Sequence, residues 1–231
     1  MRNSPVINAA AGLAIAGAAV MVFLAANDLP PSTDRAFHAA IGQAIARETL
    51  TQIKPGAGVI AIVRDTSAFR HPESDFQFDA FAEALRIAGS PLVATQSLQV
   101  DPLRNIEVPP GDFYELIRKA PPGTAIVSFM GPPMLSDEQR SRLAEIHSRI
   151  IAFCPGTIPR RVDLRSFFDN GLLHAAVVEQ DPAATATRAH AGKDNPTPLK
   201  PADWFAAHYR ILHSTDDAFP TPGTSAARET R

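Results

Sequence analysis

The chain has 231 residues, a length that suits one folded domain with additional segments. Hydrophobic residues make up 45% and charged residues 20%, so there is enough apolar material for a core. The formal net charge of -2 excludes the strongly basic surface of a typical nucleic-acid-binding protein. The single cysteine, Cys154, excludes an intramolecular disulfide. We therefore expect a globular protein with no nucleic-acid partner.

Residues 6–26 form an uncharged apolar segment that contains one polar side chain, Asn8. A helix of this length covers about 30 Å, the thickness of the bilayer hydrocarbon core. Arg2 precedes the segment and Asp28 follows it, so the positive-inside tendency places residues 1–5 in the cytoplasm. We expect a single-pass signal anchor in the cell membrane, with the following domain in the periplasm or outside the cell.

The alternative interpretation of this segment is a cleaved signal peptide, with small residues available to a peptidase near its end. The region before the apolar run has few basic side chains, and the run is longer than in most signal peptides. Both features favour the retained anchor. One side of the anchor helix is rich in small residues, which allow close helix packing in lipid. Ala10, Ala14 and Ala18 share this face, and Gly12 and Ala16 lie beside it. This pattern is typical of a simple alanine-rich anchor, or of docking against another transmembrane helix or membrane-complex subunit.

Residues 27–58 are expected to contain a juxtamembrane amphipathic helix, because Phe37, Ile41 and Ile45 recur at helical spacing. Residues 181–201 are rich in Ala, Thr and Pro and are expected to form a linker or long loop. A C-terminal helical segment, 202–217, is expected to be capped by Asp203 and to pack back on the domain. Residues 218–231 are expected to be a disordered tail.

Residues 59–180 alternate between short apolar runs and helical patterns. The runs are 59–63, 92–98, 125–130, 149–154 and 172–178. Such runs indicate strands that are buried on both faces. The helices expected between them cover 76–88, a short stretch capped by Asp112, a stretch from Ser136 to His147, and 163–171. This alternation predicts an α/β domain with a Rossmann-like, doubly wound, mostly parallel five-stranded sheet.

Ligands of open α/β sheets bind beyond the carboxyl ends of the strands. The candidate ligand-binding residues at these ends are Arg64, Asp65, Thr66, Ser97, Gly131, Thr157 and Arg160. The charged pair Arg64 and Asp65 would hold a polar ligand by charge-assisted hydrogen bonds. Arg160 lies near the expected helix cap at Asp163, where an anion would be favoured. The alternative is that these are ordinary solvated loop residues.

No motif of a common enzyme class is found in the sequence. The Gly-Ala-Gly at 56–58 precedes its strand, whereas a dinucleotide-binding turn must follow one. There is no P-loop, no nucleophile elbow and no zinc-protease helix. Cys154 is expected to be a buried, inert thiol and His174 a satisfied core histidine. We therefore assign no catalytic residue, no metal site and no cofactor.

The five apolar runs VIAIV, LVATQSL, AIVSFM, RIIAFC and LLHAAVV resemble one lobe of the type I periplasmic sugar-binding proteins. The resemblance covers about residues 59–180 and implies a Rossmann-like lobe. That family binds its ligand between two lobes, whereas this chain has length for one. A fold does not give a function by itself, so no ligand residue is transferred from the family.

The leading functional hypothesis is a non-enzymatic, membrane-anchored module that binds a partner protein or small ligand outside the cytoplasm, as a subunit of a membrane complex. The first alternative is an anchored hydrolase or transferase, with Asp65 as base and Arg64 or Arg160 as anion clamp. The meeting of Arg64, Asp65, Ser97 and Thr157 in one pocket would favour that enzyme. The second alternative is a solute sensor for a partner receptor.

Overall fold

The computed structural model describes residues 34–67, 70–99, 108–143, 146–180 and 200–220. Residues from Arg35 onward belong to one compact unit. The predicted membrane helix, with its small-residue face, lies outside the described residues, as do 181–199 and 221–231 of the predicted linker and tail. Among the described helices, none combines the length and apolar character needed to cross a bilayer. The anchor, the linker and the tail from residue 221 therefore stay predictions, whereas the disordered tail is wrong at Phe219, which packs on Phe168 in the domain core.

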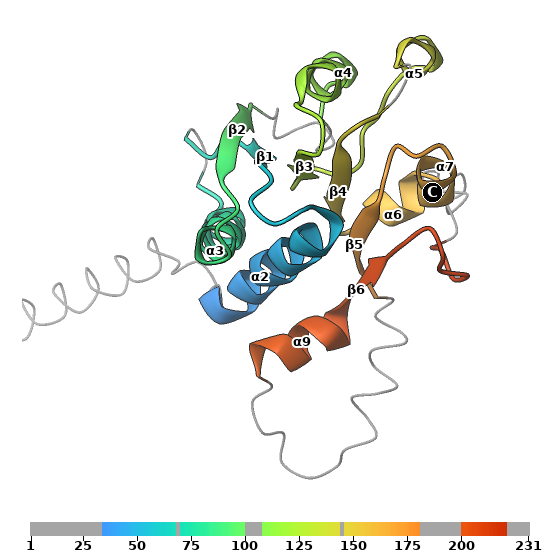
Figure 1. Cartoon of the computed structure of the whole chain (residues 1–231). Coiled ribbons are helices and arrows are strands. Elements are labelled where there is room, and N and C mark those ends of the chain that lie inside the picture. Colours follow the sequence, from blue (N-terminus) through green and yellow to red (C-terminus); the bar gives the residue numbers. More distant parts are fainter. Residues whose placement is uncertain (1–33, 68–69, 100–107, 144–145, 181–199, 221–231) are drawn as a thin grey trace, which may run out of the picture. The chain divides into compact units, whose positions relative to one another are not determined.

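The domain is built on one six-stranded sheet with the order β2-β1-β3-β4-β5-β6 (Figure 1). Its strands are β1 (Val59–Arg64), β2 (Leu92–Leu98), β3 (Ala125–Ser128), β4 (Arg149–Cys154), β5 (Ala175–Glu179) and β6 (Tyr209–Leu212). The first five are parallel to their neighbours, and β6 is antiparallel to β5. The mostly parallel α/β sheet is therefore confirmed, with one strand more than predicted.

Helices cover both faces of this sheet (Figure 1). One face packs against α2 (Arg35–Gln52), α3 (Pro72–Ile87) and α9 (Pro201–His208), and its core includes Ala61 and Val127. The other face packs against α4 (Pro110–Lys119) and α7 (Leu164–Asp169), and its core includes Ile62 and Ile126. The short helices α5 (Asp137–Arg142) and α6 (Ile158–Arg161) complete the domain. Neighbouring strand residues thus point to opposite cores, as the period of a strand requires.

Three helices begin earlier than predicted, and each begins at a proline. The first residues of α3, α4 and α9 are Pro72, Pro110 and Pro201. Proline suits the first helical position, since its φ is already helical and its missing N–H has no partner there. The predicted caps Asp112 and Asp203 are therefore wrong: both lie inside the first turn of their helices.

Other terminal signals were interpreted correctly. Asp163 Oδ1 accepts a hydrogen bond from the Ser166 amide at 3.3 Å and caps α7. Ser136 and Gln139 form the predicted capping box of α5. That helix ends at Arg142, however, and not near His147 as predicted. No residue of α5 is buried, so no apolar contact extends it beyond its capped first turns.

The C-terminal segment 202–217 is not helical throughout, which corrects the prediction. The helix α9 ends at His208, and Tyr209–Leu212 forms the strand β6 beside β5. Tyr and Ile have good strand propensity, and the otherwise unpaired edge of β5 offers hydrogen-bonding partners. The segment packs back on the domain as predicted, because Phe205 and Leu212 are buried in the two cores.

The strand β2 differs from the predicted buried strand. It lies at the edge of the sheet, and its residues 93–97 are exposed. The run LVATQSL includes Thr95, Gln96 and Ser97, which an exposed edge tolerates better than a core does.

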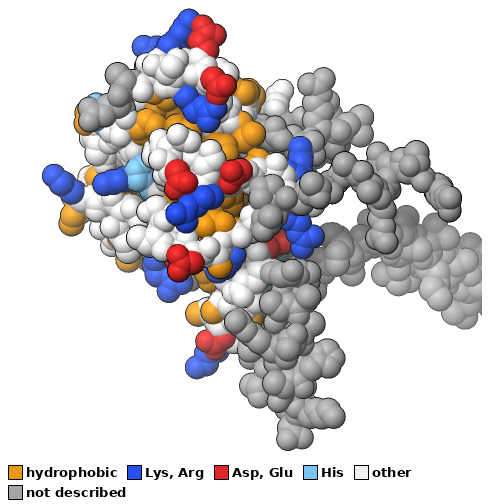
Figure 2. All heavy atoms as spheres, turned by 90° about the vertical axis from the view of Figure 1, so that its right-hand side faces the viewer, with side chains coloured by type: hydrophobic (Ala, Val, Ile, Leu, Met, Phe, Trp, Pro, Cys, Tyr) orange, Lys and Arg blue, Asp and Glu red, His pale blue; other side chains and the backbone are white. Residues whose placement is uncertain are grey.

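On the side of the domain that carries α5 and α7, acidic and basic side chains alternate with exposed hydrophobic ones (Figure 2). That view shows no large surface of a single charge.

Candidate functional site

The candidate site is a cavity of about 610 Å³ beyond the carboxyl ends of the parallel strands. Its lining comes from the ends of β1, β3, β4 and β5, from the first turns of α3, and from α2, α6 and β6. The strand order reverses between β1 and β3, and open α/β sheets bind ligands at such a switch point. The cavity therefore lies where the sequence analysis expects a ligand.

Arg64, the last residue of β1, is the predicted site residue most central to this region. It lines the 610 Å³ cavity and also a second cavity of about 380 Å³, which shares Ser74, Gln77 and Phe129 with the first. The side chain is half-buried. Within the described ranges, no carboxylate forms an ion pair with its guanidinium. A guanidinium in this position is available to an anionic group of a ligand.

Asp65, Thr66 and Ser97 line the second cavity together with Arg64. Asp65 Oδ1 accepts a hydrogen bond from the Ser67 amide at 2.8 Å. This bond lowers the pKa of Asp65, so the carboxylate is a weak base. Thr66 Oγ1 donates to Asp75 Oδ1 at 3.0 Å. Asp65 and Thr66 thus organise the loop between β1 and α3, and the geometry does not favour Asp65 as a general base.

The other predicted residues follow β3 and β4. Thr157 lines the 610 Å³ cavity, whereas Gly131 and Arg160 are not among its lining residues. Gly131 has φ of 94°, a conformation that favours glycine, and its amide donates to the Phe153 carbonyl at 3.1 Å. It therefore shapes the turn after β3. In α6 the lining residues are Ile158 and Arg161, and not the predicted Arg160.

The structure does not bring Arg64, Asp65, Ser97 and Thr157 into one pocket. Arg64 and Thr157 share the larger cavity, and Arg64, Asp65 and Ser97 share the smaller one. The arrangement expected of the hydrolase or transferase is therefore absent among the described residues.

Two carboxylates in the larger cavity were missed by the sequence analysis. Glu73 comes from the first turn of α3, and Glu179 is the last residue of β5. The Tyr209 hydroxyl donates to Glu179 Oε1 at 3.4 Å. Burial raises the pKa of Tyr209, and the charges of Glu179 and Glu73 raise it further. Both carboxylates thus act on one phenol, a juxtaposition that depends on β6, which was expected to be helical.

A close contact between α2 and α3 positions another side of the cavity. Gln77 Nε2 and His38 Nδ1 lie 3.2 Å apart, and both residues line the cavity. Gly42, one turn further along α2, lets α3 approach closely. A Cβ at Gly42 would lie 1.9 Å from the Gln77 carbonyl oxygen. The glycine therefore sets the spacing at which the two helices present His38 and Gln77.

Cys154 is buried as predicted, whereas His174 is hydrogen-bonded as predicted but precedes β5 and does not lie in the core. Cys154 is fully buried, and burial raises the pKa of its thiol, so no reactive thiolate forms at neutral pH. His174 is partly buried, and its Nδ1 accepts a hydrogen bond from the Ile150 amide at 3.1 Å. Burial, with a contribution from Arg149, lowers the pKa of His174 to about 4. Neither side chain lines the candidate cavity.

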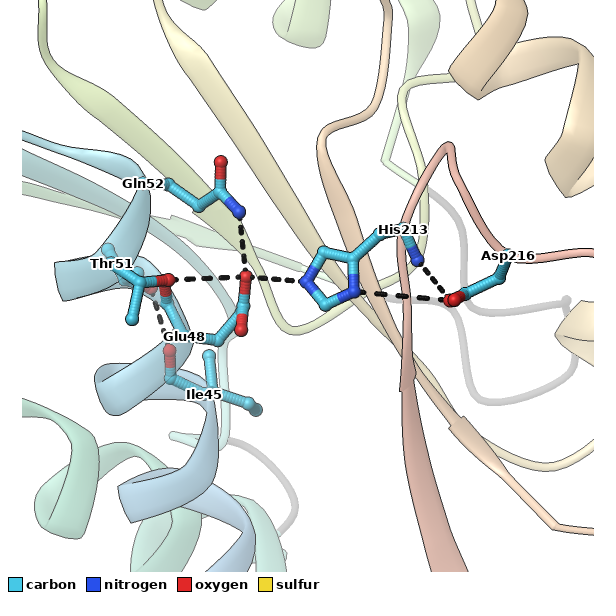
Figure 3. Close-up of polar contacts among 7 residues, drawn as sticks. Ile45, Glu48, Thr51, Gln52, His213 and Asp216 are labelled. Atoms are coloured by element: carbon cyan, nitrogen blue, oxygen red, sulfur yellow. Dashed lines mark hydrogen bonds and ion pairs between the residues drawn. The ribbon is translucent and has the colours of Figure 1, made fainter.

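A second polar cluster lies at the opposite end of the sheet, where the parallel strands begin (Figure 3). The carboxylate of Glu48 in α2 is buried and lies 2.9 Å from His213 Nε2, just after β6. Gln52 Nε2 donates to the same Glu48 oxygen at 2.8 Å. The His213 amide donates to Asp216 Oδ2 at 2.7 Å. These bonds connect α2 with the turn after β6 and satisfy the buried carboxylate inside the protein.

No family model and no curated protein matches the chain. Among solved structures, the chain is similar to an arabinose-binding protein from Geobacillus stearothermophilus, with 12% identity, a TM-score of 0.47, and coverage of 77% of this chain and 61% of that one. A sugar-binding protein of a sugar ABC transporter from Bacillus halodurans has 13% identity and a TM-score of 0.49, and the match covers 77% of this chain and 62% of that one. A myo-inositol-binding protein from Caulobacter has 20% identity and a TM-score of 0.42, and the match covers 71% of this chain and 55% of that one.

The first two neighbours are sugar-binding proteins, as the resemblance of the five apolar runs predicts, and the third binds myo-inositol. The chain spans about three fifths of the length of the solved structures that it matches, 61% and 62% for the first two named. At such low identity the likeness concerns the fold and identifies no ligand of this chain.

Proposed function

We propose that this chain is a non-enzymatic module that binds a small polar ligand in the 610 Å³ cavity, and that residues 6–26 hold it at the membrane outside the cytoplasm. The cavity carries the proposal. Its volume suits a small ligand, and its lining combines the apolar side chains of Phe129, Met130 and Phe153 with polar and charged ones. The absence of a catalytic motif from the sequence agrees with binding as the primary role.

Ligand binding is tested on the full chain in mild detergent. Trp204 is the single tryptophan of the chain, and its ring stacks on that of Phe37 with the centroids 4.7 Å apart. Its centroid lies 5.8 Å from that of Tyr209, which lines the cavity. Its fluorescence should therefore respond to ligands in a panel of polyols, amino acids, carboxylates and phosphates. We expect at least one class to change the emission and to raise the melting temperature.

A variant that fills the cavity and a matched control test where the ligand binds. Thr157→Phe adds a bulky ring at an exposed lining residue, whereas Ser141→Phe adds the same ring on α5, outside the lining. We expect Thr157→Phe to abolish the response and Ser141→Phe to preserve it. No response from any class, or a response that Thr157→Phe leaves unchanged, would refute binding in this cavity.

The anchor is tested separately. The chain should stay in the membrane during alkaline extraction, and external protease should degrade its domain in intact spheroplasts, because residues 1–5 are expected to be cytoplasmic. The proposed membrane-complex subunit would copurify with a partner in mild detergent. Replacing Ala10, Ala14 and Ala18 by Leu should remove that partner while the chain remains in the membrane. Release of the wild-type chain by alkaline extraction would contradict the anchor.

A further inference from the structure

The charges around the 610 Å³ cavity are of both signs. Arg64 and Arg161 contribute two positive charges, and Glu73 and Glu179 contribute two negative charges, so these four side chains sum to zero. Arg64 forms no ion pair with Glu73 or Glu179. The cavity therefore keeps the guanidinium of Arg64 separate from these two carboxylates.

The negative groups gather around Tyr209. The Tyr209 hydroxyl lies 3.4 Å from Glu179 Oε1, and the charge of Glu73 also acts on this phenol. The two carboxylates come from separate elements, the end of β5 and the first turn of α3. A cationic group placed here would meet carboxylates from two elements and the rings of Tyr209 and Phe153, whose centroids lie 5.9 Å apart.

The positive part of the lining includes Arg64, at the end of β1. The strands β3 and β4 lie between β1 and β5 in the sheet, so the backbones of Arg64 and Glu179 are three strand spacings apart, about 14 Å. Both residues line the cavity, and both side chains are long. Phe129, Met130 and Phe153, at the ends of the intervening strands, supply apolar lining between them.

We propose that the cavity binds a small organic zwitterion, with an ammonium group directed to Glu73 and Glu179, a carboxylate directed to Arg64, and an apolar stem over the phenylalanine rings. This inference rests on the proposed function and names the class of its ligand. An anion would occupy the Arg64 side and leave two carboxylates without a counter-charge. A cation would occupy the side of the carboxylates and leave Arg64 without a counter-charge. A neutral polyol would hydrogen-bond to all these groups but compensate none of their charges.

The test uses δ-aminovalerate as the zwitterion, with γ-aminobutyrate and ε-aminocaproate as its shorter and longer homologues. Valerate lacks the ammonium group, pentylamine lacks the carboxylate, and myo-inositol is an uncharged polyol. Affinities are measured by calorimetry and Trp204 fluorescence on the full chain in mild detergent. We expect at least one zwitterion to bind about tenfold or more tightly than either singly charged analogue, since each charged hydrogen bond contributes about that factor.

The variants assign each charge to its partner. Arg64→Gln should weaken zwitterion and valerate binding about tenfold or more and leave pentylamine unchanged. Glu73→Gln and Glu179→Gln should weaken zwitterion and pentylamine binding and leave valerate unchanged. The matched controls are Arg149→Gln, at the other end of the sheet, and Glu83→Gln, further along α3; neither residue lines the cavity. Both controls should bind like the wild type.

Three outcomes would contradict the inference in different ways. If myo-inositol or a singly charged analogue binds as tightly as every zwitterion, and Thr157→Phe removes that binding, the cavity is a ligand site but the zwitterion is wrong. If no compound of this panel or of the wider panel binds, the proposed function fails together with the inference. Equal losses for all ligands in Arg64→Gln would also contradict the assignment of the carboxylate to Arg64.

Discussion

The two ends of the parallel sheet differ in how their polar side chains are satisfied. At the end where the strands begin, Glu48 is buried and receives hydrogen bonds from Gln52 and His213, and His174 accepts one from the Ile150 amide. At the end where the strands finish, Arg64 lines two cavities without an ion-pair partner among the described residues. We infer that the first end contributes stability and that the second end is kept available for a ligand.

The helix α2 connects these two ends, so the largest effect is expected where it packs on α3. In Gly42→Ala the new Cβ would lie 1.9 Å from the Gln77 carbonyl oxygen, which neither backbone can accommodate in place. We expect the free energy of unfolding to fall by about 3 kcal/mol or more, as for severe overpacking. Urea denaturation measures this. Gly111→Ala, where no atom lies within 4 Å of the new Cβ, is the control and should be as stable as wild type. Equal stability of both variants would refute the tight α2–α3 contact.

The next largest effect concerns the cluster where the strands begin. Glu48→Ala leaves Gln52 and His213 without their shared acceptor and should destabilise the domain by about 1–3 kcal/mol. Urea denaturation measures the loss, and Trp204 fluorescence should show an unchanged ligand affinity. Glu83→Ala, on the exposed surface of α3, should leave the stability unchanged. A loss of ligand affinity in Glu48→Ala, at a temperature where it is fully folded, would show that the two ends are not independent.

A smaller effect is expected from pH. The pKa of His174 is lowered from 6.5 to about 4 in the folded state, chiefly by burial. The unfolded chain therefore binds a proton first as the pH falls, and stability present above pH 6.5 is lost as the pH falls toward about 4. With partial exposure taken into account, we expect a loss of about 1–2 kcal/mol.

This pH dependence is measured by urea denaturation at a series of pH values. His174→Asn should flatten the profile between pH 6.5 and 4, whereas His147→Asn, at an exposed position, should retain it. An unchanged profile in His174→Asn would contradict a neutral, partly buried His174.

The smallest effect concerns the reactivity of Cys154, which is tested on the wild-type chain. The thiol is fully buried and burial raises its pKa, so a maleimide should label the native chain far more slowly than the urea-unfolded chain. Mass spectrometry of timed samples measures the rates. Labelling of the native chain as fast as that of a free thiol would show that β4 is exposed.

The strands could be predicted from the sequence because their signal is local. The runs that became β1, β3 and β4 are apolar on both faces, and burial beneath two helical layers requires that composition. The helix starts were predicted less well, because Pro72, Pro110 and Pro201 are compatible both with a loop and with a first helical position. Local composition does not distinguish these two conformations.

The candidate site could be predicted only in part. The rule that ligands bind at strand ends identified Arg64 and Thr157, because both follow recognisable strands. Glu73, Glu179 and Tyr209 were missed, since their meeting depends on the antiparallel pairing of β6 with β5. That pairing joins segments separated by residues 181–199, and no periodicity in Tyr209–Leu212 distinguishes a strand from the end of α9.

The most direct test of the contrast between the two ends compares Arg64→Met with Glu48→Met in urea denaturation. Methionine keeps most of the length of both side chains and removes the charge. If Arg64 is kept for a ligand, Arg64→Met should leave the unfolding free energy unchanged or raise it, since a half-buried charge without a partner costs stability. Glu48→Met should lower it, because His213 and Gln52 lose their acceptor. If Arg64→Met destabilised the domain as much as Glu48→Met, Arg64 would be structural and the central claim would be wrong.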